Sequence, residues 1–321
     1  MKPWAKFLRR ILPLLISVTL LAIMVSYTPW SKVGVILSDF DLGTILILIT
    51  LSLAYYGLKA VRFWYILQAM DIHQPLGTVM ISYMSAQPVT LLPAGEIYRS
   101  RALERHTGVP VRSSLPQFTM QGLFEGGAMA AIGIISALAL GRLRLPVIAL
   151  ALVVIGSGLL IRNGYVASIT KLLARLPFIH VTNRNIIQFS NHHQAMLTRY
   201  WLPRLFGLSL IIELIGAAIA YTAVVGLGAH INGYQAVLVY VIPLVVGFLS
   251  LLPGGLGASE QSAIGILLLS HVSVAHAVAS TLIMRLTIVG LGLVYGGIAM
   301  VVAHRYLPPG RAAQTPSPSA K

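Results

Sequence analysis

The chain has 321 residues, of which 57% are hydrophobic and only 10% are charged, with a mean hydropathy of +0.83 and no Cys. A soluble domain carries about 25% charged residues, so this composition excludes a soluble enzyme of this size. The absence of Cys excludes disulfide scaffolds and thiolate metal sites. A net charge of +15 would indicate nucleic-acid binding in a soluble protein. Here the basic residues flank apolar runs, so we expect an integral membrane protein with no nucleic-acid partner.

Apolar runs of roughly 20 residues predict membrane-spanning helices in an all-α protein. The predicted full spans are 11–29, 42–70, 116–140, 145–161, 203–229 and 277–303. The first follows a basic N-terminal segment but is long and has no small-x-small cleavage site, so we interpret it as an uncleaved span. These spans predict one polytopic membrane domain over residues 1–310, followed by a disordered tail over 311–321.

Two further apolar stretches, 76–95 and 234–270, contain Pro and Gly at positions that should interrupt a helix. The first contains Leu91-Leu92-Pro93-Ala94-Gly95, and the second contains Leu251-Leu252-Pro253-Gly254-Gly255-Leu256-Gly257. We expect both to form re-entrant or broken helical hairpins, which gives about six full spans and two hairpins. The alternative is that both stretches cross fully and the protein has eight spans.

The positions of Lys and Arg predict the orientation, because positive residues concentrate on the cytoplasmic side. With both termini cytoplasmic, only Lys32, Arg142 and Arg144 fall outside, and Arg285 lies within the membrane. The cytoplasmic group includes Lys59 and Arg62, at the inner end of span 42–70. This asymmetry predicts a multi-pass protein of the cytoplasmic membrane.

A shift of 160 residues superposes the unusual features of the two halves, about 1–141 and 142–305. Leu91-Leu92-Pro93 coincides with Leu251-Leu252-Pro253, and span 42–70 coincides with 202–230. Three crossings and one hairpin per half would invert the second half relative to the first, which is a construction of secondary transporters. The alternative is that Pro and Gly merely kink two ordinary spans.

Four carboxylates and one arginine lie in or beside apolar segments, where a charge costs about 2.5–3.5 kcal/mol and usually faces a cavity or a partner. They are Glu96, Glu125, Glu213, Glu260 and Arg285. Glu96 and Glu260 follow the two breaks, where a helix start presents free amides that suit an anion. Each of the two could instead cap its helix. We expect Arg285 to pair with Glu125 or Glu213, and Glu213 to be neutral and hydrogen-bonded or to act as a proton relay.

A basic run of Arg99, Arg101, Arg105 and Arg112 follows the first hairpin. Arg101 and Arg105 share a helix face, and such clusters attract anionic lipid headgroups at roughly 1 kcal/mol per residue. Ordinary positive-inside topology is the alternative explanation, and Arg99 is the member most suited to a site. The sequence contains no P-loop, hydrolase or zinc-protease motif, so we expect no cofactor, no metal and no enzymatic activity.

Each half of the sequence contains a block that follows a break. The first is Leu92-Pro93-Ala94-Gly95-Glu96-Ile97-Tyr98-Arg99, with Gly108-Val109-Pro110 and Glu125 after it. The second is Pro253-Gly254-Gly255-Leu256-Gly257-Ala258-Ser259-Glu260, with Met284-Arg285 after it. The two blocks resemble the transmembrane family of lysylphosphatidylglycerol synthases, and the similarity covers roughly 45–305. Gly126-Gly127 depart from the family pattern, which has charges there.

The resemblance implies a role in moving phospholipid between leaflets. Together with Glu213, it gives as candidate substrate-binding residues Pro93, Gly95, Glu96, Arg99, Glu125, Glu213, Pro253, Gly254, Gly255, Gly257, Glu260 and Arg285. The chain lacks the aminoacyl-transferase domain of the full synthases, so we do not expect it to lysylate lipid. The leading hypothesis is a lipid translocase that acts on anionic headgroups. The alternatives are a non-catalytic partner of a lipid-synthesis enzyme or glycosyltransferase, and an ion-coupled transporter of small solutes.

Overall fold

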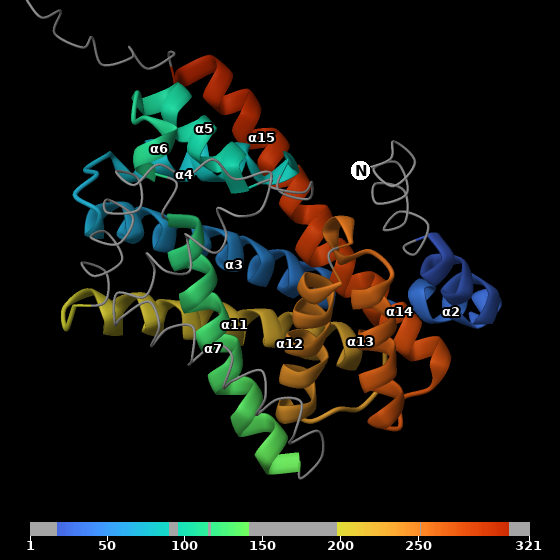
Figure 1. Cartoon of the computed structure of the whole chain (residues 1–321). Coiled ribbons are helices and arrows are strands. Elements are labelled where there is room, and N and C mark those ends of the chain that lie inside the picture. The colour runs from blue at the N-terminus through green and yellow to red at the C-terminus, as the bar shows by residue number, and fades with distance from the viewer. Residues whose placement is uncertain (1–17, 90–95, 115–116, 141–197, 251, 308–321) are drawn as a thin grey trace, which may run out of the picture.

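The computed structural model describes residues 18–89, 96–114, 117–140, 198–250 and 252–307 (Figure 1). These residues form helices and turns, and no strand occurs among them, which confirms the all-α class. In chain order, the helices are α2 (Trp30–Ser38), α3 (Leu42–Ala69), α4 (Leu76–Ser85), η1 (Gln87–Val89), α5 (Glu96–Thr107), α6 (Val111–Ser114), α7 (Gln117–Leu140), α11 (Trp201–Val225), α12 (Gly233–Leu249), η2 (Pro253–Gly255), α13 (Ala258–Leu269), α14 (Val274–Arg285), η3 (Leu286–Gly290) and α15 (Leu291–Tyr306).

By length and composition, four of the described helices could cross a membrane, which supports a multi-pass membrane protein. They are α3, α7, α11 and the continuous rod Val274–Tyr306, and they match four of the predicted spans. The predicted span 145–161 lies outside the described residues. The described part of span 11–29 is a helix over Val18–Tyr27 that meets α2 at an angle of 82°. The sequence did not predict α2, which begins just after Pro29.

Polar side chains define where several helices begin. The Asp41 carboxylate accepts from the Thr44 amide at 3.0 Å and caps α3. Asn232 and Gln235 form a reciprocal capping box at the start of α12. The Ser273 hydroxyl accepts from the His276 amide and caps α14. Each cap satisfies an amide that the first helical turn leaves without an intrahelical partner.

The centre of the bundle is the antiparallel pair α3 and α11, which pack along their length. Ile66 near the end of α3 packs in one cluster with Leu205 near the start of α11. At the other end, Thr44 of α3 contacts Gly226, which follows α11. In Figure 1, the two helices lie side by side, with α7 and α12 packed on α11.

The first predicted break begins at Pro88, the proline that was expected to interrupt the stretch 76–95. Helix α4 ends at Ser85, and a short 3-10 turn follows over Gln87–Val89. Residues 90–95, with Pro93 and Gly95, lie outside the described residues. Helix α4 packs against α3 and α15, and Pro88 lies so close to Gly296 of α15 that a Cβ there would be 2.6 Å from the proline ring. The start of this break is therefore fixed against the last span.

The second break lies where the sequence predicted it. Helix α12 runs through Pro243 without interruption and ends at Leu249. The 3-10 turn η2 includes Gly254 and Gly255, with φ values of 60° and 67°, and Gly257 after it has a φ of 87°. Only Gly adopts such values at little cost, so these residues turn the chain back into α13. Helices α12 and α13 pack against each other as a hairpin, orange in Figure 1.

The last span contains a widened turn, because Leu286–Gly290 form a π-helical segment between α14 and α15. Such a turn breaks the regular pattern of backbone hydrogen bonds. Two side chains of α3 donate to carbonyls in this segment: Ser52 to Thr287, at 2.9 Å, and Tyr56 to Ile288. The π segment therefore docks on α3 through side-chain hydrogen bonds.

Candidate functional site

A charged cluster lies between α3 and α7 and consists of Lys59, Arg62 and Glu125. Lys59 Nζ lies 2.6 Å from Glu125 Oε1, and Arg62 Nη2 lies 2.9 Å from Glu125 Oε2. The Arg62 side chain is only 1% exposed, and its Nη1 donates to Ser209 of α11 at 3.0 Å. Because Lys59 and Arg62 are three residues apart on one helix, they reach the same carboxylate.

This geometry corrects one prediction. Glu125 pairs with Lys59 and Arg62 and does not pair with Arg285. The side chains of Lys59 and Arg62 are 13% and 1% exposed, so both lie largely within the bundle. The reason is energetic: a buried carboxylate is stable only with charged partners at close range, and α3 supplies two.

Glu213 of α11 lies next to this cluster and is fully buried. Its Oε2 accepts a hydrogen bond from the Tyr240 hydroxyl at 2.9 Å, and the Tyr55 hydroxyl lies 3.0 Å from that of Tyr240. The Tyr55 ring faces Lys59 Nζ at 4.5 Å. The predicted hydrogen bond of Glu213 is therefore confirmed, and the predicted Glu213–Arg285 pair is wrong. The neutral state of Glu213 stays a prediction.

Gly216 of α11 allows Tyr240 to reach Glu213. A methyl group at position 216 would overlap the Tyr240 ring, so only glycine leaves room for the ring against this turn of the helix. Tyr240 lies on α12, the first helix of the second hairpin. The close approach therefore fixes the hairpin against the helix that carries Glu213.

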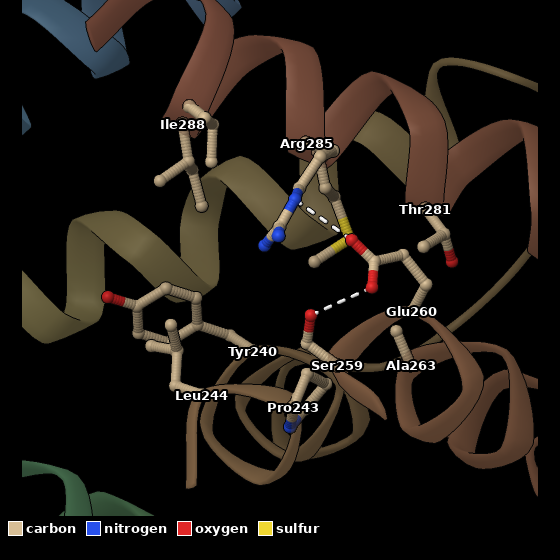
Figure 2. Close-up of a pocket in the computed structure, with 11 residues that line it drawn as sticks. Tyr240, Pro243, Leu244, Ser259, Glu260, Ala263, Thr281, Arg285 and Ile288 are labelled. Atoms are coloured by element: carbon tan, nitrogen blue, oxygen red, sulfur yellow. Dashed lines mark hydrogen bonds and ion pairs between the residues drawn. The ribbon is translucent and has the colours of Figure 1, made fainter. Parts of the chain in front are cut away.

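The second break holds an ion pair between Glu260 and Arg285. Glu260 Oε1 lies 2.9 Å from Arg285 Nε, and Arg285 Nη2 donates to the Gly254 carbonyl at 2.7 Å. The other carboxylate oxygen accepts from the Gly257 amide at 2.7 Å, so Glu260 also caps α13. The predicted cap is therefore confirmed, and the same carboxylate carries a charged partner. Figure 2 shows Arg285 and Ser259 on either side of Glu260.

A cavity of about 100 Å³ lies beside this ion pair, between α12, α13 and the last span. Its lining includes Tyr240, Pro243, Ser259, Glu260, Thr281 and Arg285. In Figure 2 the Tyr240 hydroxyl points away from Arg285, while the ring lines the cavity. Ligand pockets are typically several times larger, so this volume suits a small polar group rather than a whole lipid. The ring of Tyr240 lines the cavity and its hydroxyl bonds to Glu213, so this side chain links the two.

The first break has a different arrangement around Arg99. This residue is buried, donates to the Gln87 side chain at 2.9 Å, and lies over the Tyr83 ring at 4.1 Å from its centroid. Glu96 begins α5, next to the undescribed residues 90–95. Arg99 therefore ties α5 back to the end of α4.

The structure brings together the predicted residues Gly254, Gly255, Gly257, Glu260 and Arg285, with Pro253 at the start of the turn. Glu125 and Arg99 lie in separate clusters. Sequence reasoning missed Lys59, Arg62 and Tyr240 as members of the polar interior. The signal for the first two was present, because two cations three residues apart within an apolar run would share a buried face. Within the described residues, no group of three His, Asp or Glu side chains could hold a metal.

Comparison with curated proteins finds no match. A family model, the lysylphosphatidylglycerol synthase TM region, matches residues 10–296. The match includes both sequence blocks, the charged cluster and the Glu260–Arg285 pair, and it confirms the resemblance that those blocks indicated. The chain therefore belongs to the family of the lysylphosphatidylglycerol synthase TM region.

Proposed function

We propose that the protein moves a phospholipid or a lipid-linked headgroup across the cytoplasmic membrane, with Glu260 and Arg285 at the headgroup site. One observation carries the proposal: a charged pair lies at a helix break, inside an otherwise apolar hairpin, beside a cavity. Arg285 is 29% exposed and Glu260 is 7% exposed, so the cation is the accessible partner. The family supports a role that concerns membrane lipid.

Exchange of partners at Arg285 is the proposed chemical step. A lipid phosphate offers the guanidinium a negative charge and two acceptor oxygens, as the Glu260 carboxylate does. When phosphate replaces Glu260 at Arg285, the carboxylate keeps its hydrogen bonds from the Gly257 amide and from Ser259. The released carboxylate can then attract a headgroup cation. The chain acts by binding and release, without a covalent step, and is not an enzyme in this proposal.

An inverted repeat would provide alternating access to this site. The shift of 160 residues carries α3 onto α11, and these two helices run in opposite directions. In Figure 1, α7 and the rod α14–α15, its counterpart, also run in opposite directions. Both observations favour six spans and two hairpins that enter from opposite faces. The distribution of Lys and Arg along the sequence is the basis for placing the termini in the cytoplasm.

Reconstituted protein tests the proposal. Liposomes that contain the full chain and a fluorescent phosphatidylglycerol should lose outer-leaflet and then inner-leaflet fluorescence to a membrane-impermeant quencher. Glu260→Gln and Arg285→Ala should each slow the inner-leaflet phase at least about tenfold, which corresponds to one lost charged contact of about 1.4 kcal/mol. Glu104→Gln, an exposed carboxylate outside the site, is the matched control. Unchanged rates in both site variants would defeat the proposal.

Ion-coupled transport of a small solute is a second candidate, favoured by one observation at Glu213. Its Oε1 is buried and has no hydrogen-bond partner within the part of the chain described here. A buried carboxyl oxygen without a donor suits a group that binds and releases a proton. Solute-induced proton uptake that disappears in Glu213→Gln, with no lipid movement, would favour this candidate over the first.

A further inference from the structure

A second cavity lies on the outside of the bundle, between α4, α5 and the C-terminal end of α15. Its volume is 680 Å³, and the residues that line it include Tyr98, Arg101, Arg105, His106, Met300 and His304. In Figure 1, α5 and the end of α15 lie together at one end of the molecule. This cavity is separate from the Glu260–Arg285 pair and has no role in the proposed transport step.

The cations of this cavity are not neutralised by neighbouring acids. Within the described residues, neither Arg101 nor Arg105 has an ion-pair partner. The nearest acid along the chain, Glu104, uses its Oε1 to accept from the Val111 amide, at the start of α6. The guanidinium of Arg101 instead faces the Tyr98 ring, at 5.7 Å from its centroid. Because Arg101 and Arg105 both line this cavity without an acidic partner, they favour the binding of an anion there. A guanidinium group binds phosphate through two hydrogen bonds.

An apolar stripe leads away from the cavity along α15. Leu293, Gly297, Met300 and His304 follow one another at spacings of four, three and four residues, so they share one helix face. Leu293 is 38% exposed and Met300 is 42% exposed. Between them, a Cβ at Gly297 would meet nothing within 4 Å, so the helix surface is open there. A free phosphate compound would gain nothing from such a stripe, whereas an acyl chain would bury apolar surface on it.

We infer that this cavity is a second lipid site, which holds the phosphate of an anionic phospholipid between Arg101 and Arg105 while an acyl chain lies along Leu293, Gly297 and Met300. His106 and His304 line the same mouth and offer further donors. The lipid comes from the leaflet that meets α5. The site holds lipid at equilibrium whether or not the protein transports it.

Native mass spectrometry of the full chain tests this site. Detergent-solubilised protein is titrated with dioleoylphosphatidylglycerol, and retained lipids are counted. The double variant Arg101→Ala/Arg105→Ala should weaken retention about 30-fold, because each charge contributes about fivefold. The matched control is Arg204→Ala/Arg305→Ala, which removes the same charge from exposed positions outside the cavity. This control should change retention less than about threefold.

Three outcomes would overturn the inference. An equal loss of lipid retention in the two double variants would mean that lipid is attracted to the basic surface in general and not to this cavity. Displacement of the lipid by glycerol 3-phosphate or inorganic phosphate at equal concentration would assign the cavity to soluble phosphate compounds. Equal retention of dioleoylphosphatidylcholine would remove the preference for an anion. Retention is measured at equilibrium in detergent and leaflet movement is measured in liposomes, so a failure of the transport proposal leaves this test intact.

Discussion

The first half of the chain encloses Glu125 between two cations, whereas the second half gives Glu260 one cation and a helix start. In the first half, Lys59 and Arg62 come from a single helix and are covered by the bundle. In the second half, Arg285 is partly exposed and reaches the Gly254 carbonyl at the break. The two ion pairs therefore differ in exposure and in position. The first joins α3 to α7 within the bundle, and the second lies at a helix break, where the proposed function gives Arg285 an exchange of partners.

The two hairpins differ in a parallel way. Helix α13 carries Glu260 as its one charge and is otherwise apolar or uncharged, whereas α5 carries three cations and the acid Glu104 besides Glu96. A helix as polar as α5 cannot lie against hydrocarbon without a large cost, so it belongs near the headgroups. The contrast agrees with the two proposals, which assign a surface lipid contact to the first break and an interior headgroup site to the second.

The largest expected effect comes from opening the charged cluster. Glu125→Gln leaves Lys59 and Arg62 buried without a counter-charge, and should lower the free energy of unfolding by roughly 3–5 kcal/mol. Glu260→Gln should cost only about 1–2 kcal/mol, because Arg285 is partly solvated and the Gln oxygen still accepts from Gly257. Thermal and denaturant unfolding in detergent measure both. A larger loss for Glu260→Gln would reverse the assignment of roles.

The geometry of the second break gives the next largest effect. Gly255→Ala forces a side chain into a φ of 67° and places its Cβ 2.8 Å from Gly247 Cα on α12. We expect a loss of about 1–3 kcal/mol and a weakened Glu260–Arg285 pair. Gly265→Ala is the control, because it lies within α13 and a Cβ there meets nothing within 4 Å. Similar unfolding curves for the two variants would show that the break tolerates other backbone conformations.

Removal of the Tyr240 hydroxyl, which contacts Tyr55 in the first half of the chain, should lower stability by a smaller amount. Tyr240→Phe deletes the donor to Glu213 and the contact with Tyr55. It leaves a buried carboxyl without a partner, at a cost of about 1–2 kcal/mol. Tyr234→Phe, at an exposed hydroxyl on the same helix, is the matched control. Equal thermal midpoints for the two variants would mean that Tyr240 acts through its ring alone.

The smallest predicted effect is a pH dependence in the first hairpin. Burial, and then the charge of Arg105, lower the pKa of His106 below its usual value. The unfolded chain therefore binds a proton more readily, so stability should fall as the pH drops below about 6.5. His106→Gln should flatten this decline, as measured by thermal unfolding between pH 7.5 and about 5. An unchanged pH profile would assign the decline to other groups.

Composition and apolar run length were enough to predict the helical class and the four spans, because the bilayer imposes length and polarity on each crossing. The second break could also be predicted from the sequence, since the consecutive glycines after Pro253 favour a turn. The start of the first break could be predicted too, since Pro88 interrupts the stretch 76–95 and α4 ends at Ser85. The packing of Pro88 against Gly296 could not be predicted, because it depends on a helix two hundred residues away.

The ion-pair partners could not be predicted from one-dimensional symmetry. Glu125 and Arg285 coincide under the shift of 160 residues, but positions related by such a shift need not touch. Their real partners depend on which helices pack together: α3 brings Lys59 and Arg62 to Glu125, and α13 brings Glu260 to Arg285. Tyr240 gave no sequence signal, because a tyrosine in an apolar helix is common and its reach depends on Gly216.

The π-helical segment Leu286–Gly290 sets the rotational phase between the two ends of the last span. Each residue advances an α-helix by about 100°, so deletion of one residue here would turn Arg285 away from Glu260 or turn Met300 and His304 away from α5. The extra residue of the π-helical segment thus sets the rotation of one end of the span relative to the other. The hydrogen bonds from Ser52 and Tyr56 fix this segment against α3, so sequence changes on one side of it need not rotate the other side.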